Sequence, residues 1–237
     1  MSAVLSPKTF RVTEIFSSLQ GEGPRMGEKH LFIRFEACHR TCAYCDESSR
    51  LGRAMSLEAI LKKTDALEEK EGPHSCVSLT GGEPLLYADF LKPLCRALKK
   101  RKFRILLETS GVLESQLSKV VGECDIIAMD LKLPSMTRQR DFLQEHRRFL
   151  GIAKKKELYL KVVVSKAVDI RELNRHLRMV AAVAPKIPDF LQPLSRAGKP
   201  YPDPLLMRYL FQLQRIGAKR LPGLRVGIQL HKVLNIR

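Results

Sequence analysis

Cys38-His39-Arg40-Thr41-Cys42-Ala43-Tyr44-Cys45 places three cysteines in one short segment, directly after the apolar run Leu31–Phe35. Thiolates this close along the chain can converge on one metal centre, and thiolate is the ligand that iron–sulfur clusters take. A closed structural site usually has four protein ligands, whereas three leave one position open for chemistry. The segment therefore predicts a cluster-binding loop at the end of a strand. A structural zinc site completed by His39 or by a distant cysteine is the alternative.

Strand and helix patterns alternate about six times along the rest of the chain, which predicts a parallel sheet. The strands are expected at 10–17, 31–36, 75–79, 103–107, 125–129, 158–164, 189–191 and 224–228. The helices are expected at 56–69, from Asp89 onward, and at 114–121, 137–149, 169–183 and from Asp203 onward.

Unusual polar residues follow the strands: the cysteines, TGGEP at 80–84, ETSG at 108–111, MDLK at 129–132, and Gln192-Pro193. A parallel barrel places its active site at these carboxyl ends of strands. Six units are too few to close an eightfold barrel. We therefore predict an α/β fold, a partial, open TIM-like barrel of about six parallel strands with outer helices.

The length of 237 residues suits one sizeable core, so we predict a single domain, 1–237. Residues 1–30 would form an N-terminal strand and substrate loop, 31–195 the partial barrel, and 196–237 a C-terminal helix, strand and tail. No apolar run approaches the roughly 20 residues of a membrane helix. The N-terminus MSAVLSPKTF lacks a signal-peptide core, which predicts a cytoplasmic protein. Cys76, Cys95 and Cys124 are isolated in apolar segments and are expected to be buried.

The chain carries 42 Lys and Arg against 25 Asp and Glu, a net charge of +17. Such a field could attract nucleic acid, an acidic electron-transfer protein or an anionic substrate. The basic groups have no interleaved aromatic residues and no nucleic-acid-binding motif beside them. A solvated basic surface is therefore favoured, and nucleic acid is not the expected partner.

Two further features lie close to the first strands. Gln20-Gly21-Glu22-Gly23-Pro24 is a turn-rich loop, whose glycines let the backbone approach a ligand closely. Arg34 lies inside an apolar strand, where a guanidinium needs an acidic partner or an anionic ligand. Pairing of Arg34 with Glu14 or Glu36 remains open on the residues alone, as does a purely structural role for His231.

The three cysteines together with Thr80-Gly81-Gly82-Glu83-Pro84 resemble the radical S-adenosylmethionine (SAM) superfamily. The resemblance implies a [4Fe-4S] cluster on Cys38, Cys42 and Cys45, with SAM on the fourth iron and the GGE segment at the amino group of SAM. The implied chemistry is reductive cleavage of SAM to a 5′-deoxyadenosyl radical.

Within that superfamily, EIFSSLQGEGP at 14–24, Arg34 and Gln229-Leu230-His231-Lys232 resemble the 7-carboxy-7-deazaguanine synthase (QueE) family. The family converts 6-carboxy-5,6,7,8-tetrahydropterin into 7-carboxy-7-deazaguanine with release of ammonia, for queuosine and related 7-deazapurines. The SAM contacts that the resemblance implies are Tyr44, Asp46, Gly82, Glu83, Ser110, Asp130, Lys132, Gln192 and Ser195. The implied pterin contacts are Leu19, Gln20, Gly21, Glu22, Arg34, Thr80, His231 and Arg237.

Two positions depart from the family pattern. Glu47 stands where a threonine commonly binds Mg²⁺; a carboxylate is itself a hard oxygen ligand, so Glu47 is a candidate Mg²⁺ ligand of altered geometry. Asp130 stands where many members carry serine, and it could still accept a hydrogen bond from SAM.

Three other functions compete with this interpretation. They are a radical SAM activating enzyme for a glycyl-radical protein, a tRNA-directed protein that uses the positive charge, and a non-catalytic metal-binding protein. The family resemblance also implies a flavodoxin- or ferredoxin-type electron donor and a homodimer.

Overall fold

A computed structural model describes residues 10–45, 51–195 and 201–236. One nine-stranded sheet runs through it in the order β3-β1-β2-β4-β5-β6-β7-β8-β9. The strands are β1 Phe10–Leu19, β2 Lys29–Phe35, β3 Arg53–Met55, β4 Cys76–Gly81, β5 Arg104–Thr109, β6 Ile126–Asp130, β7 Glu157–Val164, β8 Asp189–Pro193 and β9 Leu224–Val226. The helices are η1 Gly23–Arg25, α1 Leu57–Glu71, η2 Pro84–Tyr87, α2 Ala88–Lys100, α3 Glu114–Val120, α4 Pro134–Thr137, α5 Leu143–Ala153, α6 Ile170–Val183, α7 Pro204–Gly217 and α8 Leu230–Val233.

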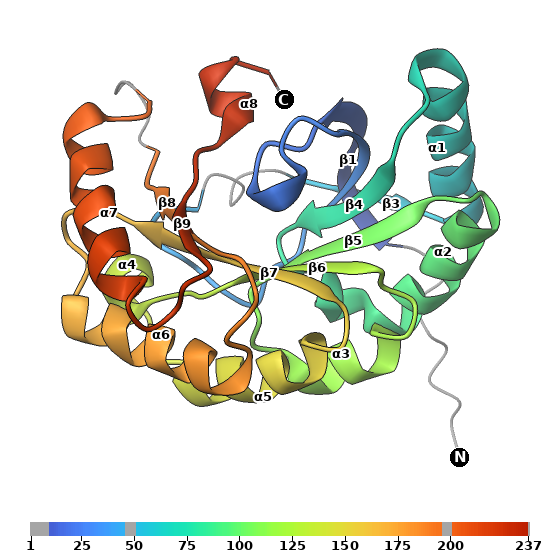
Figure 1. The fold of residues 1–237 in the computed structure, drawn as a ribbon. Coiled ribbons are helices and arrows are strands. Elements are labelled where there is room, and N and C mark those ends of the chain that lie inside the picture. Colours follow the sequence, from blue (N-terminus) through green and yellow to red (C-terminus); the bar gives the residue numbers. More distant parts are fainter. Residues whose placement is uncertain (1–9, 46–50, 196–200, 237) are drawn as a thin grey trace.

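Seven neighbouring strands, β2 and β4 to β9, are parallel, and β1 and β3 extend the sheet antiparallel at one edge. The larger helices cover the outer side of the curved sheet, whereas α8 lies beside the loop that follows β1 (Figure 1). The two edge strands, β3 and β9, do not pair with each other. The prediction of a partial, open barrel with outer helices is confirmed, with seven parallel strands rather than about six.

The period-2 pattern of the strands divides the core into two layers. In β7, Leu158, Leu160, Val162 and Val164 pack into the large core shared with the helices, while Tyr159 faces the barrel interior. An interior apolar layer is formed by Cys76, Leu106, Ile126, Ala128, Tyr159 and Phe190. Cys76, Cys95 and Cys124 are buried as expected. The interior above this layer is where polar side chains gather.

Several predicted boundaries are wrong. The single helix expected at 137–149 is two helices, α4 and α5, because Arg138 ends α4 in a left-handed conformation with φ of 59°. The helix expected to be capped by Asp89 begins one residue earlier, at Ala88. The strand expected at 224–228 ends at Val226, and the short edge strand β3 was not predicted. Three-residue strands carry too little pattern to identify them from sequence.

Asp189 begins β8 as a fully buried carboxyl group between Leu160 of β7 and Leu224 of β9. Neither of its oxygens has a hydrogen-bond partner among the described residues. Burial raises the pKa of Asp189 from 3.8 to about 7, and the nearby backbone N–H of Phe190 only lessens this shift. Asp189 is therefore about half protonated in the folded protein at pH 7 and largely protonated at pH 5 and below.

Replacing Asp189 by asparagine is expected to stabilise the protein at alkaline pH. A folded pKa above the unfolded one means that the folded state binds the extra proton, so stability is lost as pH rises through about 7. At pH 8.5 the variant should unfold with a free energy higher by roughly 4 kcal/mol, and at pH 4 the difference should be small. Urea denaturation at both pH values tests this, with the exposed Asp89→Asn as control. An equal difference at both pH values would contradict it.

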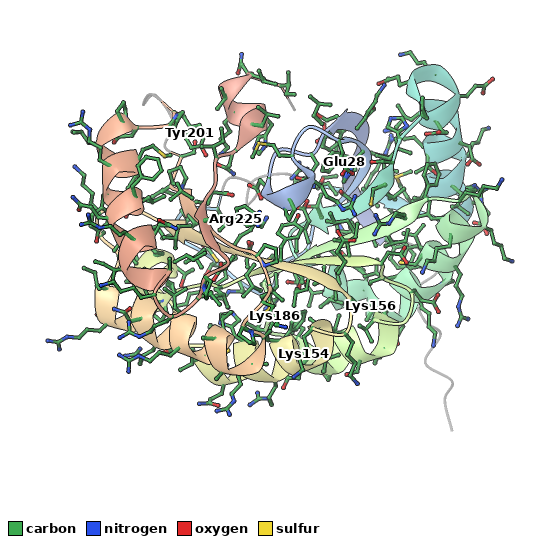
Figure 2. The ribbon with its side chains drawn as sticks, viewed as in Figure 1. Glu28, Lys154, Lys156, Lys186, Tyr201 and Arg225 are labelled. Atoms are coloured by element: carbon green, nitrogen blue, oxygen red, sulfur yellow. The ribbon has the colours of Figure 1, made fainter. Side chains whose placement is uncertain are left out.

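Part of the basic surface lies on the side of the molecule away from α8. Lys154, Lys156 and Lys186 lie at the side of the molecule away from α8, whereas Tyr201 lies on the side of α8 (Figure 2). In the part of the chain that the structure describes, no helix has the length and apolar character needed to cross a membrane.

Candidate active site

A cavity of about 280 Å³ opens at the carboxyl ends of the parallel strands. It brings together most of the predicted site residues, from both the SAM set and the pterin set. Those that line it are Leu19, Gln20, Gly21, Glu22, Arg34, Cys38, Cys42, Tyr44, Cys45, Thr80, Gly82, Ser110, Asp130, Lys132, Gln192, Ser195 and His231. Asp46, Glu47 and Arg237 lie outside the described residues.

The cysteine loop follows β2 and is held in place by backbone hydrogen bonds. The N–H of Cys45 donates to the carbonyl of Cys42 (3.0 Å), which forms a turn, and the N–H of Ala43 donates to the carbonyl of Thr137 in α4 (3.2 Å). All three cysteine side chains are thiols exposed or half-exposed toward the cavity. The loop therefore presents three sulfur ligands from a fixed backbone.

Cys38 is influenced by the other two cysteines of the loop. Burial raises the pKa of the Cys38 thiol, and Glu83, Cys42 and Cys45 raise it further, while the N–H of Arg40 lowers it. Among residues 10–45, 51–195 and 201–236, no three His, Cys, Asp or Glu side chains converge closely enough for one metal ion. A [4Fe-4S] cluster accepts a wider triangle, since each thiolate binds a different iron. Three cysteines on one loop beside a cavity fit a cluster that leaves one iron open.

The TGGEP segment packs directly against the base of the cysteine loop. The N–H groups of Gly82 and Glu83 donate to the carbonyls of Phe35 (2.9 Å) and Ala37 (2.8 Å). A Cβ on Gly82 would lie 2.2 Å from the Ala37 oxygen, so only glycine permits this approach. The carboxylate of Glu83 is fully buried and accepts hydrogen bonds from Thr109 and from Ser110 rather than facing the cavity. Its geometry supports the loop backbone, and a direct contact of its side chain with SAM stays a prediction.

Asp130 and Lys132 form an ion pair at the end of β6, with 2.7 Å between Oδ2 and Nζ. The Lys132 ammonium also lies 5.4 Å from the centre of the Tyr44 ring, within the range of a cation–π contact. Burial lowers the pKa of Lys132, but the Asp130 carboxylate and the Tyr44 hydroxyl outweigh burial, and the pKa is raised. Lys132 is therefore a permanent cation beside the cysteine loop, where it suits an anionic group such as the carboxylate of SAM.

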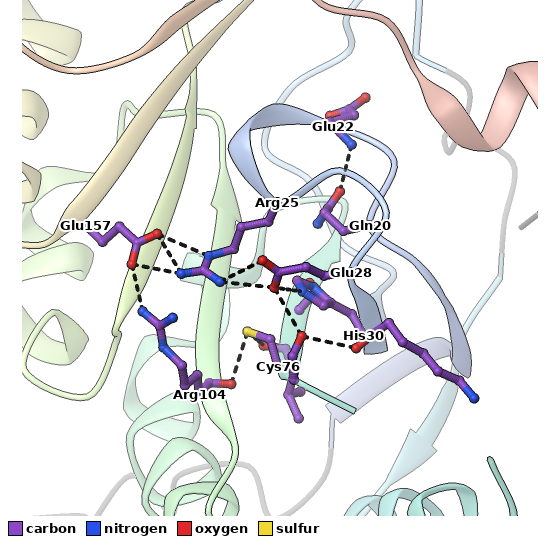
Figure 3. Close-up of polar contacts among 12 residues, drawn as sticks. Gln20, Glu22, Arg25, Glu28, His30, Cys76, Arg104 and Glu157 are labelled. Atoms are coloured by element: carbon purple, nitrogen blue, oxygen red, sulfur yellow. Dashed lines mark hydrogen bonds and ion pairs between the residues drawn. The ribbon is translucent and has the colours of Figure 1, made fainter. Parts of the chain in front are cut away.

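The loop after β1 is tied to the barrel by Arg25. Its guanidinium pairs with Glu28 (3.0 Å) and with Glu157 at the start of β7 (2.8 Å), as Figure 3 shows. Within the same loop, the N–H of Glu22 donates to the side-chain oxygen of Gln20 (3.1 Å). The loop is thus a defined structure that carries Glu22 toward the barrel interior.

Glu22 is the centre of a buried network that joins three parts of the chain. Its carboxylate pairs with the Lys161 ammonium of β7 and accepts hydrogen bonds from Gln192 of β8 and Gln229 near the C-terminus, each at 2.8 Å. Burial raises the pKa of Glu22, but these partners, led by Lys161, outweigh it and lower the pKa to about 2. The carboxylate is ionised, and three of its roughly four acceptor sites are already filled by the protein.

A second carboxylate, Glu108 at the end of β5, lies in the same cavity. It accepts hydrogen bonds from Gln20 (3.0 Å) and Thr80 (2.9 Å), two of the predicted pterin contacts. Arg34 approaches Glu14 at 3.6 Å and lies over the Phe16 ring at 5.4 Å, so pairing with Glu14 is the arrangement observed, while Glu36 pairs with Arg11. Arg34 also lines the cavity.

The tail after β9 closes this side of the cavity. The N–H of Leu230 donates to the carbonyl of Gly21 (2.9 Å), and the N–H of Gln229 to the hydroxyl of Tyr201 (2.7 Å). A Cβ on Gly21 would lie 2.1 Å from Nδ1 of His231, so the glycine makes room for the imidazole. His231 is a half-buried residue of the cavity wall and not a core histidine.

Four residues of the site were missed by the sequence predictions: Arg40, Glu108, Lys161 and Gln229. Lys161 could have been identified as a site residue from the sequence, because it interrupts the apolar strand LYLKVVV just as Arg34 interrupts LFIRFE. Glu108 and Gln229 lie inside segments already recognised as polar strand ends, and only the fold shows which side chain turns inward.

Comparison with known proteins gives consistent results. Residues 32–164 match the model of the radical SAM superfamily. A 7-carboxy-7-deazaguanine synthase from Geobacter sulfurreducens is 34% identical over 93% of this chain and 95% of its own length, and one from Methanopyrus kandleri is 38% identical over 65% of this chain and 69% of its own. The crystal structure of QueE from Escherichia coli superposes with a TM-score of 0.64 at 20% identity, over 94% of this chain and 95% of that one, which shows a shared fold.

The superfamily match covers more than half of the chain, and the Geobacter relative matches nearly all of it. Both agree with a site in which a three-cysteine loop and a GG segment meet at the carboxyl ends of parallel strands. The chain belongs to the radical SAM superfamily and, within it, to the 7-carboxy-7-deazaguanine synthase family.

Proposed function

We propose that this protein converts 6-carboxy-5,6,7,8-tetrahydropterin into 7-carboxy-7-deazaguanine with release of ammonia, as a radical SAM lyase. The main support for the proposal is that the three-cysteine loop and the loop containing Gln20 and Glu22 line the same cavity. Any radical SAM site needs the three-cysteine loop, whereas the loop containing Gln20 and Glu22 is not needed for SAM cleavage in general. The relatives named above carry the same activity in their names.

The protein would hold its cofactors with residues at one side of the cavity. Cys38, Cys42 and Cys45 would bind the [4Fe-4S] cluster, and Lys132 would face the carboxylate of SAM. The cluster and SAM supply, when bound, the 5′-deoxyadenosyl radical that abstracts hydrogen from C6 of the pterin. Further SAM contacts would come from the remaining residues of that predicted set: Tyr44, Asp46, Gly82, Glu83, Ser110, Asp130, Gln192 and Ser195.

The other side of the cavity has the chemistry to hold a carboxypterin. Arg34 offers a guanidinium to the substrate carboxylate, in the bidentate geometry that Arg and carboxylates favour. Glu108 presents acceptor oxygens, held by Gln20 and Thr80, to the N–H groups of the pterin edge. The ionised Glu22 keeps Gln229 and the tail in place, so that His231 forms part of the wall. Leu19, Gly21 and Arg237 would complete the substrate contacts.

Anaerobic incubation of the reconstituted protein with the carboxytetrahydropterin, SAM and a reductant tests the proposal. The expected product is 7-carboxy-7-deazaguanine, identified by mass spectrometry. Arg34→Ala should lose product formation by at least tenfold through a raised KM, while Arg11→Ala, an exposed arginine of the same sheet, should not. SAM cleavage without any 7-deazaguanine product in the parental protein would refute the substrate.

Five finer features belong to the same proposal. The reductant in the cell would be a flavodoxin- or ferredoxin-type protein, and the enzyme would act in the cytoplasm as a homodimer of single-domain chains. Mg²⁺ would bind at Glu47, where a carboxylate replaces a hydroxyl ligand.

A further inference from the structure

Arg40 is the most isolated charge near the active site. It lies in the three-residue turn between Cys38 and Cys42 and lines the cavity, yet it is only 7% exposed. All three guanidinium nitrogens are buried, and none has a hydrogen-bond partner among the described residues. Its backbone N–H, by contrast, is engaged with the sulfur of Cys38. The segment between two of the predicted cluster ligands thus carries a buried positive charge.

No described neighbour of this guanidinium accepts a hydrogen bond from it. It lies 4.0 Å from the centre of the Phe142 ring, an apolar contact with a weak cation–π component. Buried His146 is near, but burial, His176 and Arg40 lower its pKa to about 3, so His146 is neutral. The buried carboxylate of Glu83 accepts its hydrogen bonds from Thr109, Ser110 and Leu85.

A buried guanidinium without a partner is strongly unfavourable, and natural structures pair such a group or bind an anion there. Three thiolates and the cluster they hold form an anion, whose charge grows by one unit when the cluster is reduced. The potential of an iron–sulfur cluster depends on its charge, on hydrogen bonds to its sulfurs and on the surrounding field. The position and the missing partner of Arg40 match this group.

We propose that Arg40 is the built-in counter-charge of the cluster site, which favours cluster binding and raises the reduction potential of the bound cluster. This role rests on the radical SAM assignment and is independent of the pterin substrate. It needs no hydrogen bond to iron or sulfide, since a charge in a buried region acts over several ångströms. Packing of Arg40 on Phe142, with no effect on the cluster, is the competing explanation.

A redox titration of the reconstituted protein without SAM, followed by electron paramagnetic resonance, separates the two explanations. Arg40→Met should make reduction at least tenfold less favourable, a shift of about 59 mV to lower potential for one electron. Arg40→Lys, which keeps the charge, should retain most of the parental potential. Arg140→Met is the matched control: Arg140 lies over the same Phe142 ring at 3.9 Å, but its side chain is 64% exposed and paired with Glu145.

An unchanged potential in Arg40→Met, or an equal shift in Arg140→Met, would overturn the proposal. Unfolding of the cluster-free protein gives a second test, which holds even where the variant takes up little cluster. In the cluster-free protein, the Arg40→Met substitution removes an uncompensated buried charge. The variant should therefore be as stable as the parental protein or more stable. The gain in melting temperature on adding the cluster should shrink. A cluster-free variant that unfolds at a lower temperature would show that Arg40 has a packing role instead.

Discussion

Replacing Lys161 by methionine is expected to lower the free energy of unfolding at pH 7 by about 3–5 kcal/mol, since it leaves the buried Glu22 carboxylate without its cation. The Lys161 side chain is only 7% exposed, so water cannot take its place. Gln192 and Gln229 still donate to Glu22, but neutral donors do not balance a charge. Urea denaturation of the cluster-free protein measures this loss, and product formation should fall with it.

Two comparisons sharpen this expectation. Lys119→Met removes a cation from an exposed pair with Asp89, and such pairs contribute only about 0–1 kcal/mol. The double variant Glu22→Gln/Lys161→Met removes both charges, so it should be more stable than Lys161→Met alone. A single variant as stable as the parental protein would mean that Lys161 does not compensate Glu22.

Acidification should narrow the difference between Lys161→Met and the parental protein. The folded pKa of Glu22, about 2, is below its ordinary 4.5, so its contribution is present above pH 4.5 and is lost as pH falls toward 2. In Lys161→Met, burial remains the largest influence on the pKa of Glu22 and favours its protonated carboxyl group. The free energies of unfolding of Lys161→Met and of the parental protein should therefore differ less at pH 3 than at pH 7.

Gly82→Ala is expected to reduce cluster incorporation by at least tenfold. The new methyl carbon would lie 2.2 Å from the carbonyl oxygen of Ala37 and 2.8 Å from that of Glu36, and both are backbone atoms that cannot rotate away. The cysteine loop would have to move off the TGGEP segment, and overpacking of this kind destabilises by about 1–3 kcal/mol or more. Iron and sulfide content after anaerobic reconstitution measures the effect.

Gly122→Ala is the control for this variant, because a Cβ at Gly122 meets no atom within 4 Å. That variant should bind a full cluster. Normal iron and sulfide content in Gly82→Ala would show that the loop can shift without losing its ligands. It would contradict the view that backbone contact between the two segments sets the cluster position.

The sequence predicted the parallel, open barrel and the meeting of its polar strand ends, because periodicity and strand-end residues are local signals. It did not predict which groups pair inside the cavity. The oxygens of Glu22 are engaged by Lys161, Gln192 and Gln229, which come from three distant segments, while its contact with the pterin stays a prediction. Such pairing depends on strand order and on which side chains face the interior, and the local spacing of residues predicts neither.

Glu83 and Arg40 also show that a sequence motif does not predict the burial and the partners of a side chain. The GGE segment identifies Glu83 as part of the site, yet its carboxylate is turned toward Thr109 and Ser110. Arg40 lies between two predicted ligand cysteines, and the sequence does not show that it is buried without a hydrogen-bond partner among the described residues, since these are properties of the fold. Motif residues locate a site, while burial and partners decide what each side chain does there.

The hydrogen bond between Glu22 and Gln229 joins residues 207 positions apart, and it has a consequence for the order in which the protein matures. The barrel strands from β2 to β8 can assemble while the chain is still leaving the ribosome, since each pairs with a near neighbour in sequence. The wall formed by Gln229 and His231 is translated after all of them. The cysteine loop and most of the substrate side are therefore translated before the wall of Gln229 and His231, and the cavity is complete only when the C-terminal tail has folded onto Glu22.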